Sequence, residues 1–289
     1  MINKNSPQIA TNEPDFQKLL LSISLARSAP YRSFFRCTSD KETVGAYFWG
    51  QAIAAAFQPT LGMYEVALRN AIHREASRMS SRGTSDSYPW YDNHLREALP
   101  TRGKTRDKVE DVLCDKFGVR LAVQPSPDQV VASLSFGFWT SFLVGLTQRQ
   151  QPVLLTRVFA GHPHSKPAHW SYSGNVEQLM KKLKGIQNLR NAVAHYEPIW
   201  KPHRLTGTEP NWTQCISSLR DKHSDMLTVM TWCCPDSAHA VANSYATRVF
   251  RSICSTNAVR AFLADPFGAG LRCTVNSGHA CLKPPAAVR

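Results

Sequence analysis

The sequence predicts an all-α fold, an irregular bundle of helices. Apolar residues recur at spacings of three and four in several long segments, which is the period of an α-helix with one buried face. Helix-capping residues begin some of these segments, and Pro and Gly separate others. The sequence contains no convincing pair of strands, internal repeat or phosphate-binding glycine loop, so no sheet of consequence is expected.

The N-terminal half is predicted to contain a short amphipathic helix, a long helix and a charged helix. The long helix is expected from Glu42 to Met79. Pro59 lies within it and predicts a kink or a division into two helices, because proline lacks a backbone donor. Turn-forming residues then predict a loop over 81–93. The other two helices are expected over 14–28 and 104–117.

A clear helix start follows. Ser126 is predicted as the N-cap, with Pro127 in the first helical position and Asp128 and Gln129 in the first turn. From residue 130 onward this helix is uncharged, and it is expected to run to about Leu146. Its segment VVASLSFGFWTSFLVGL falls short of a membrane span of about 20 residues and carries several Ser and Thr, so a buried core helix is expected instead.

The C-terminal half is predicted to continue with four helices and an exposed connection. Asn175 is expected to cap the second of these helices, with Gln178 as its capping-box partner. The helices are expected over 150–160, 175–195, 211–232 and 236–254, and the connection over 161–174. The predicted domains are a variable N-terminal extension over 1–43, a helical domain over 44–260, and a flexible tail over 261–289 that is rich in Gly, Pro and Ser.

The composition favours an anionic partner. A net charge of +13 makes a polyanion the first expectation, although a basic protein can also simply be basic. The N-terminal sequence shows no secretory signal, so a cytoplasmic protein with free thiols is expected. There is no CxxC pair, and neither Cys233 with Cys234 nor the group Cys273, His279 and Cys281 suits a tetrahedral zinc site. No metal or other cofactor is expected.

The segment LRNAVAHYEPIW, residues 189–200, is the strongest candidate site. On a helix, Arg190 falls within the apolar stripe of Val176, Leu179, Met180, Leu183 and Ile186. Asn191 and His195 are four apart and lie together on its flank, and Pro198 ends the helix just after the histidine. An inward arginine must be paired or open into a groove, so a cleft or a subunit interface lined by these three residues is expected.

These residue types suit RNA cleavage without a metal. Arginine holds a phosphate through a fixed fork of donors, and histidine transfers a proton near neutral pH. The 2′-hydroxyl would attack its own phosphodiester while His195 moves protons and Arg190 stabilises charge at phosphorus. The spacing alone is weak evidence, because a chain of this composition contains an arginine five residues before a histidine by chance about as often as not. Arg157 and His162 repeat it, but Gly161 and Pro163 predict that this copy leaves its helix.

The region around this segment is basic and aromatic. Residues 147–206 carry nine lysines and arginines against two glutamates. Aromatic residues that can stack on unpaired bases interleave with these charges, namely Trp170, Tyr172, Tyr196 and Trp200. Candidate RNA-binding residues are Lys181, Lys182, Lys184, Tyr196, Trp200 and Lys201. The alternative for the first three lysines is a solvated helix face.

The segment LRNAVAHYEPIW resembles the signature of the abortive-infection (Abi) family, within the HEPN group of all-helical ribonucleases. Three further segments resemble family blocks in the right order: FWGQAIAAAFQPTLGMYEVALRNAIHR, YPWYDN and VVASLSFGFWTSFL. The resemblance covers roughly residues 44–235. It implies a HEPN-type fold and metal-independent RNA cleavage, with the R-N-x-x-x-H motif carried by Arg190, Asn191 and His195. It also implies a homodimer with two motifs facing one cleft, a role in phage defence or as a toxin, and an inhibitory small RNA or protein antitoxin.

A shorter echo of this motif lies in LRNAIHR, residues 68–74. Arg69 and His73 are four apart and share a helical face, but the segment is one residue shorter than the motif. A structural ion pair or an RNA contact is therefore expected here rather than catalysis.

Three classes of function remain open from the sequence. The first is a HEPN-type endoribonuclease, which the presence of all three motif residues favours. The second is a non-catalytic RNA-binding or regulatory module of a defence system. The third is a protein-interaction bundle whose basic charge is incidental.

Overall fold

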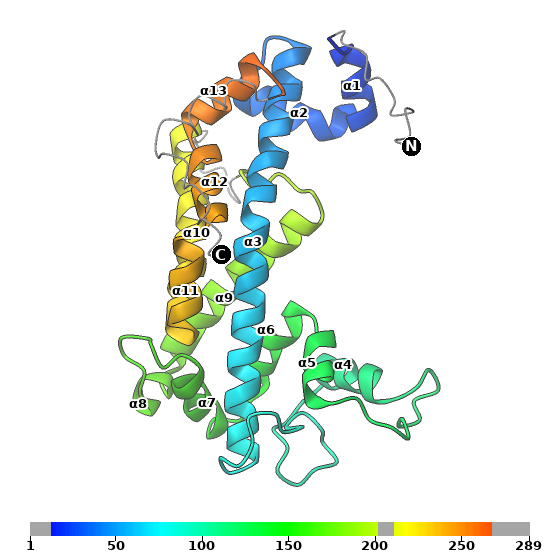
Figure 1. Ribbon diagram of the computed structural model, residues 1–289, viewed down its shortest axis with the longest axis vertical. Helices are drawn as coiled ribbons and strands as arrows, with labels where there is room; N and C mark the ends of the chain where they lie inside the picture. Colours follow the sequence, from blue (N-terminus) through cyan, green and yellow to red (C-terminus); the bar gives the residue numbers. More distant parts are fainter. Residues whose placement is uncertain (1–12, 202–210, 268–289) are drawn as a thin grey trace, which may run out of the picture. The chain divides into compact units, whose positions relative to one another are not determined.

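The computed structural model describes residues 13–201 and 211–267. These residues form thirteen helices and contain no strand; one isolated bridge joins Cys114 and Arg120 (Figure 1). The predicted all-α class is therefore confirmed for the described part of the chain. No helix among these residues is long and apolar enough to cross a membrane.

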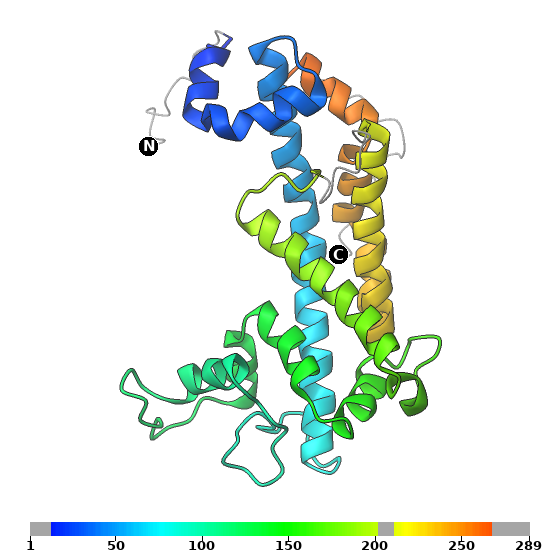
Figure 2. The ribbon, with the colours of Figure 1, turned by 180° about the vertical axis from the view of Figure 1, so that it is seen from behind.

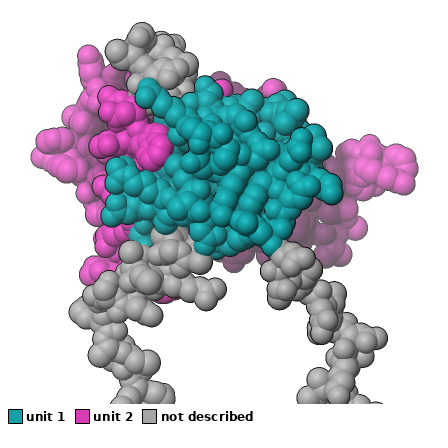
Figure 3. Space-filling model, turned by 90° about the horizontal axis from the view of Figure 1, so that it is seen from above, with its two compact units in different colours: residues 1–53, 252–289 teal, residues 54–251 magenta. Residues whose placement is uncertain are grey.

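The chain divides into two compact units, which Figure 3 shows in different colours. Unit 1 comprises residues 1–53 and 252–289, and unit 2 comprises residues 54–251. Compactness does not test which parts fold independently, so the predicted domain limits at 43/44 and 260/261 stay predictions. The tail residues 268–289 lie outside the described residues, as do the cysteines at 273 and 281.

Unit 1 contains helices α1 (Phe16–Ile23), α2 (Leu25–Phe35), the start of α3 (Asp40–Ser80) and α13 (Thr256–Ala264). The single helix predicted over 14–28 is wrong, because Ser24 adopts a left-handed φ of 80° that ends α1, and its side chain then caps α2. The Trp49 indole donates a hydrogen bond to the Ile253 carbonyl at 3.1 Å, which ties α3 to the C-terminal segment.

Unit 2 contains the remainder of α3 and most of the other helices. These are α4 (Lys104–Leu113), α5 (Pro127–Ser133), α6 (Phe136–Gly145), α7 (Gln150–Val158), α8 (Pro167–Trp170), α9 (Ser173–Ala194), α10 (Trp212–Cys233), α11 (Pro235–Ala242) and α12 (Tyr245–Ile253), whose last residues belong to unit 1. Helix α9 packs against α6, α8 and α10, and Figure 2 shows it crossing obliquely in front of α3.

Helix α3 is continuous through Pro59, so the predicted alternative of two helices is wrong. An internal proline costs a helix about 3 kcal/mol, and packing on both sides of it offsets this cost. Phe57 packs its ring 4.9 Å from that of Phe250. The Thr60 hydroxyl lies 3.3 Å from His223 Nε2, and the His223 ring stacks on Phe250 at 4.2 Å. These buried contacts hold the helix on either side of the proline.

The helix predicted from Ser126 to Leu146 starts as expected but is broken in the middle. Ser126 and Gln129 form a capping box, with Pro127 in the first turn. Extended backbone at Leu134 and Ser135 then separates α5 from α6, and serine is favoured at such a helix start. The buried-core prediction is confirmed, since the Phe142 ring packs 4.5 Å from Trp90 and Trp139 is fully buried.

Several other boundaries differ from the sequence predictions. The charged helix α4 ends at Leu113, the exposed connection contains the short helix α8, and the last predicted helix is divided into α11 and α12. Asn175 does not cap α9, because that helix begins at Ser173 and the Asn175 amide instead donates to the His169 carbonyl at 2.9 Å. None of the six cysteines among the described residues forms a disulfide with another of them.

Candidate nucleic-acid interface

The segment 189–200 lies at the C-terminal end of α9. His195 is the C-cap residue, and its backbone N–H donates to the Asn191 carbonyl at 2.9 Å. Tyr196 follows in the left-handed region with a φ of 56°. The N–H groups of Tyr196 and Glu197 donate back to Val193 and Ala192, which is the Schellman pattern of a helix end. The prediction that the helix ends just after the histidine is confirmed.

Arg190 lies at the edge of the apolar face of α9. The buried stripe continues through Leu189 and Val193, so the prediction that Arg190 falls inside it is wrong. Its Nε lies 3.4 Å from Glu65 Oε2 on α3, and the two side chains are 42% and 23% exposed. An ion pair this open contributes at most about 1 kcal/mol to stability. The arginine is thus paired, as the sequence argument required, but the pair is weak enough to exchange partners.

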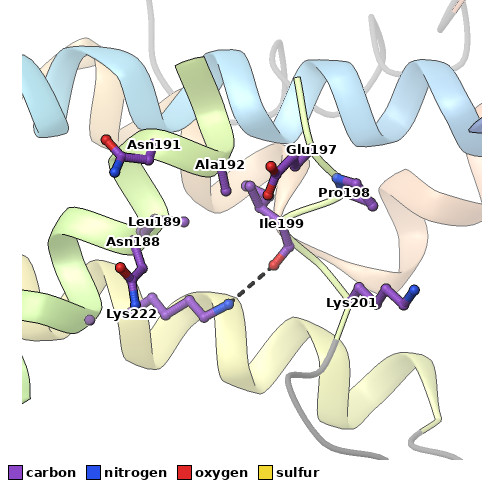
Figure 4. A pocket seen from close by; sticks show the side chains of 10 residues that line it. Asn188, Leu189, Asn191, Ala192, Glu197, Pro198, Ile199, Lys201 and Lys222 are labelled. Carbon is purple, nitrogen blue, oxygen red and sulfur yellow. Dashed lines mark hydrogen bonds between the residues drawn. The ribbon is translucent and has the colours of Figure 1, made fainter. Parts of the chain in front are cut away.

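Asn191 lines a hollow of about 590 Å³ between the end of α9 and α10 (Figure 4). Glu197 and Lys201 line it from the segment after α9, and Lys222 lines it from α10. The Lys222 Nζ donates a hydrogen bond to the Ile199 carbonyl at 3.1 Å, the dashed line in Figure 4. Two amides, two ammonium groups and the Glu197 carboxylate therefore surround one concave surface.

Lys222 is the functional candidate that the sequence did not reveal. It lies half-buried, and burial lowers the pKa of its ammonium group below the usual value. No carboxylate pairs with it among the described residues. In the sequence it belongs to RDKHSD, whose mixed charges are typical of a solvated helix face. Only the packing of α10 against α9 brings it into the hollow.

A second hollow of about 580 Å³ continues from the first along α9. Gly185, Asn188, Leu189 and Lys222 line both, and the second adds Lys181, Lys182, Lys184 and Asp225. We call the two together the α9 groove. Lys182 pairs with Asp225, and Lys184 Nζ donates to Gln187 Oε1 at 3.2 Å. The groove therefore gathers five lysines against two carboxylates.

The three motif residues are not equally placed toward this groove. Asn191 lines it, whereas Arg190 and His195 are not among its lining residues. The His195 imidazole is exposed and forms no hydrogen bond with another described residue. It lies one helical turn beyond Asn191, so a strand lying in the groove and passing over the end of α9 would reach it.

The aromatic candidates differ in exposure. Tyr196 is 65% exposed and is free to stack on a base. Trp200 is only 4% exposed, so its ring is covered in this structure, and its RNA contact stays a prediction. A tryptophan inside a basic, loop-like segment is predicted to be accessible, but here it is buried in the core, as is Ile199.

The second motif, Arg69 and His73, forms a separate polar site on α3. His73 is buried, its Nδ1 accepts a hydrogen bond from the Trp90 indole at 2.9 Å, and its Nε2 lies 3.3 Å from Asp128. Burial lowers the pKa of His73, while Asp128 opposes that shift. His73 lines a hollow together with Arg69, and its RNA contact stays a prediction. Arg69 bonds Asn70 and lines a hollow of about 410 Å³, and its RNA contact stays a prediction.

His162, the histidine of the repeated spacing, lies beyond the end of α7 at Val158. The prediction that this copy leaves its helix is confirmed. No group of three or more His, Cys, Asp or Glu that could hold a metal ion occurs in the part of the chain that the structure describes.

No family model, curated protein or solved structure matches this chain. The resemblance to the Abi family and the HEPN group therefore stays a prediction from the quoted segments.

Proposed function

We propose that this chain is a metal-independent endoribonuclease of HEPN type that acts in abortive infection or as a toxin and cleaves RNA by attack of the 2′-hydroxyl. The observation that carries the proposal is the α9 groove, in which Asn191 and five lysines meet beside the end of the helix that bears Arg190 and His195. Lysines at spacings along a groove bind the phosphates of a single strand.

Each motif residue has a distinct role in this mechanism. His195 takes the proton of the 2′-hydroxyl and returns one to the leaving 5′-oxygen. Arg190 exchanges Glu65 for the scissile phosphate, which its planar fork binds in two places. Asn191 lies within the groove and positions the ribose or phosphate. A homodimer would bring a second copy of the motif to the same strand, and a small RNA or protein antitoxin would inhibit it by occupying the groove.

A non-catalytic RNA-binding module is the second candidate. It is favoured by the pairing of Arg190 with Glu65 and by the absence of Arg190 and His195 from the groove lining. Such a module would bind RNA through the same lysines and leave it intact.

Incubation of the pure protein with mixed RNAs, with and without EDTA, separates the two. For the nuclease we expect RNA cleavage with and without EDTA, and a 2′,3′-cyclic phosphate on the 5′ product. An all-DNA strand, which lacks the attacking hydroxyl, should not be cleaved. Binding without cleavage of any RNA by folded protein would favour the binding module.

Replacing Lys181, Lys182 and Lys184 by alanine is expected to weaken RNA binding and flatten its salt dependence. Each phosphate contact adds about 0.7 to the slope of log K against log salt for a single strand, so the slope should fall by up to about 2. Fluorescence anisotropy with a labelled RNA at several salt concentrations measures it. An unchanged slope would assign these lysines to a solvated face.

Arg190→Ala is expected to impair both RNA binding and cleavage, while unfolding stability changes by less than about 1 kcal/mol because the lost ion pair is half-exposed. Arg190→Lys should restore binding more than cleavage, since lysine keeps the charge but not the fork. Glu65→Gln is the matched control and should leave activity at or above that of the unaltered protein, because it frees the guanidinium. Full activity in Arg190→Ala would contradict the assigned role.

A further inference from the structure

A third hollow of about 330 Å³ lies where the segment after α7, α8 and the start of α9 meet the end of α10. Its lining includes His162, His164, His169, Trp170, Asn175 and Trp232. Gln178 and Lys182 also line the α9 groove, so the hollow adjoins the groove at the end opposite Asn191. Its volume is within the range of about 300 to 1,000 Å³ common for small-ligand sites.

Aromatic rings form most of its wall. The His162 ring lies 4.6 Å from that of Trp232 and 4.9 Å from that of Trp170. His169 lies 5.1 Å from His162, and His164 is within 6.0 Å of it. The backbone fixes this arrangement, because the Gly161 N–H donates to the Trp232 carbonyl at 2.9 Å and places the next residue against the indole.

The surroundings of His162 disfavour the charged form of its ring. Burial lowers the pKa of its imidazole, and the charges of His169 and His164 add to the effect. The His164 backbone N–H donates to His162 Nδ1 at 3.2 Å, which leaves the ring proton on Nε2. The wall therefore offers π surface on which a flat ring can stack, with the Lys182 ammonium group beside it.

Amide groups at the rim can read the edge of such a ring. The Asn175 Nδ2 donates to the His169 carbonyl at 2.9 Å and contacts His169 Nδ1 at 3.1 Å, which orients the amide and leaves its Oδ1 as an acceptor. Gln178 is exposed where the hollow meets the groove. Amide side chains next to aromatic rings are how single-stranded RNA bases are recognised.

We propose that this hollow binds one unpaired nucleobase of the RNA strand that lies in the α9 groove. The base would stack on the histidine and tryptophan rings and hydrogen-bond to Asn175 and Gln178, with the neighbouring phosphates on the lysines of the groove. The inference rests on the RNA binding of the proposed function but does not require cleavage. A metal is the other ligand of clustered histidines, and no described group of these residues could hold one.

Titration of the histidine Cε1–H signals by NMR with nucleoside 5′-monophosphates tests this directly. We expect saturable shifts of the His162 and His169 signals, assigned from His162→Ala and His169→Ala. Ribose 5-phosphate, which lacks the base, should leave the signals unmoved.

Gln178→Ala, at an exposed position that does not affect folding, should weaken nucleotide binding several-fold, and Trp232→Ala should weaken it by at least about fivefold. Tyr245→Ala is the control, an exposed ring on α12 outside the hollow that should change nothing.

Two results would overturn the inference: no nucleotide moving these signals, or ribose 5-phosphate moving them equally. A response to Zn²⁺ alone would overturn it in favour of a metal site. Nucleotide binding by a protein that cleaves no RNA would leave the inference standing and count against the nuclease. RNA cleavage without nucleotide binding would support the nuclease and overturn the inference.

Discussion

His195→Ala is expected to reduce the rate of RNA cleavage by at least ~100-fold, the usual scale for loss of a general acid–base group. RNA affinity should change little, because phosphate contacts by lysine and arginine supply most of it. Stability should also be kept, since the backbone of His195 caps α9 while its exposed side chain has no hydrogen-bond partner among the described residues. Single-turnover cleavage of a labelled RNA, with anisotropy for binding, measures the two effects separately.

His239→Ala is the matched control for this variant. His239 is another exposed histidine near the end of a helix, α11, where it contacts Asn243, and it lines neither the groove nor the histidine hollow. The His239→Ala variant should cleave RNA at the rate of the unaltered protein. Full activity in His195→Ala would remove the histidine from the mechanism and leave the RNA-binding module as the better proposal.

Local signals in the sequence predicted the helices well where capping chemistry was explicit. Ser126 with Gln129 marked a start that the structure has, and Pro198 marked the end of α9. Boundaries failed where the backbone departs from what the residue type favours, or where neighbours distant in sequence hold a helix together. Ser24 adopts a positive φ that its residue type does not favour, and Pro59 stays inside α3 because Phe250 and His223 pack around it.

The candidate site was predicted along α9 and missed wherever a second helix contributes. The motif residues and the lysines of α9 could be read from one helical stretch. Glu65 is 125 positions from Arg190 in the sequence, so no local pattern predicts that the two side chains pair. Trp200 looked accessible and is buried, while Lys222 looked solvated and lies in the groove. Both errors concern packing between elements, which periodicity alone does not specify.

Lys222→Met is expected to weaken RNA binding by at least about tenfold, the loss of one charge-assisted hydrogen bond of about 1.5 to 3 kcal/mol. Its ammonium group lines both hollows of the groove and has no carboxylate partner among the described residues, so a phosphate would be its first anionic contact. Methionine keeps most of the length and apolar stem of the side chain, which preserves the packing of α10 against α9.

Stability should respond differently from binding in this variant. The pKa of Lys222 is lower in the folded protein than in the unfolded chain, so its positive charge destabilises the folded state at neutral pH. This destabilisation disappears only as the pH rises toward the ordinary pKa of lysine. Methionine removes that cost and loses the hydrogen bond to Ile199, and these changes oppose each other. Unfolding by urea should therefore be unchanged to within about 1 kcal/mol.

Lys108→Met supplies the comparison, because Lys108 is an exposed lysine of unit 2 that pairs with Asp111 outside the groove. It removes the same formal charge and should weaken binding by less than about twofold, the small effect of a charge screened by solvent. Equal losses in the two variants would mean that RNA responds to net charge alone. A tenfold loss confined to Lys222→Met, in protein of unaltered stability, would place the phosphates between α9 and α10.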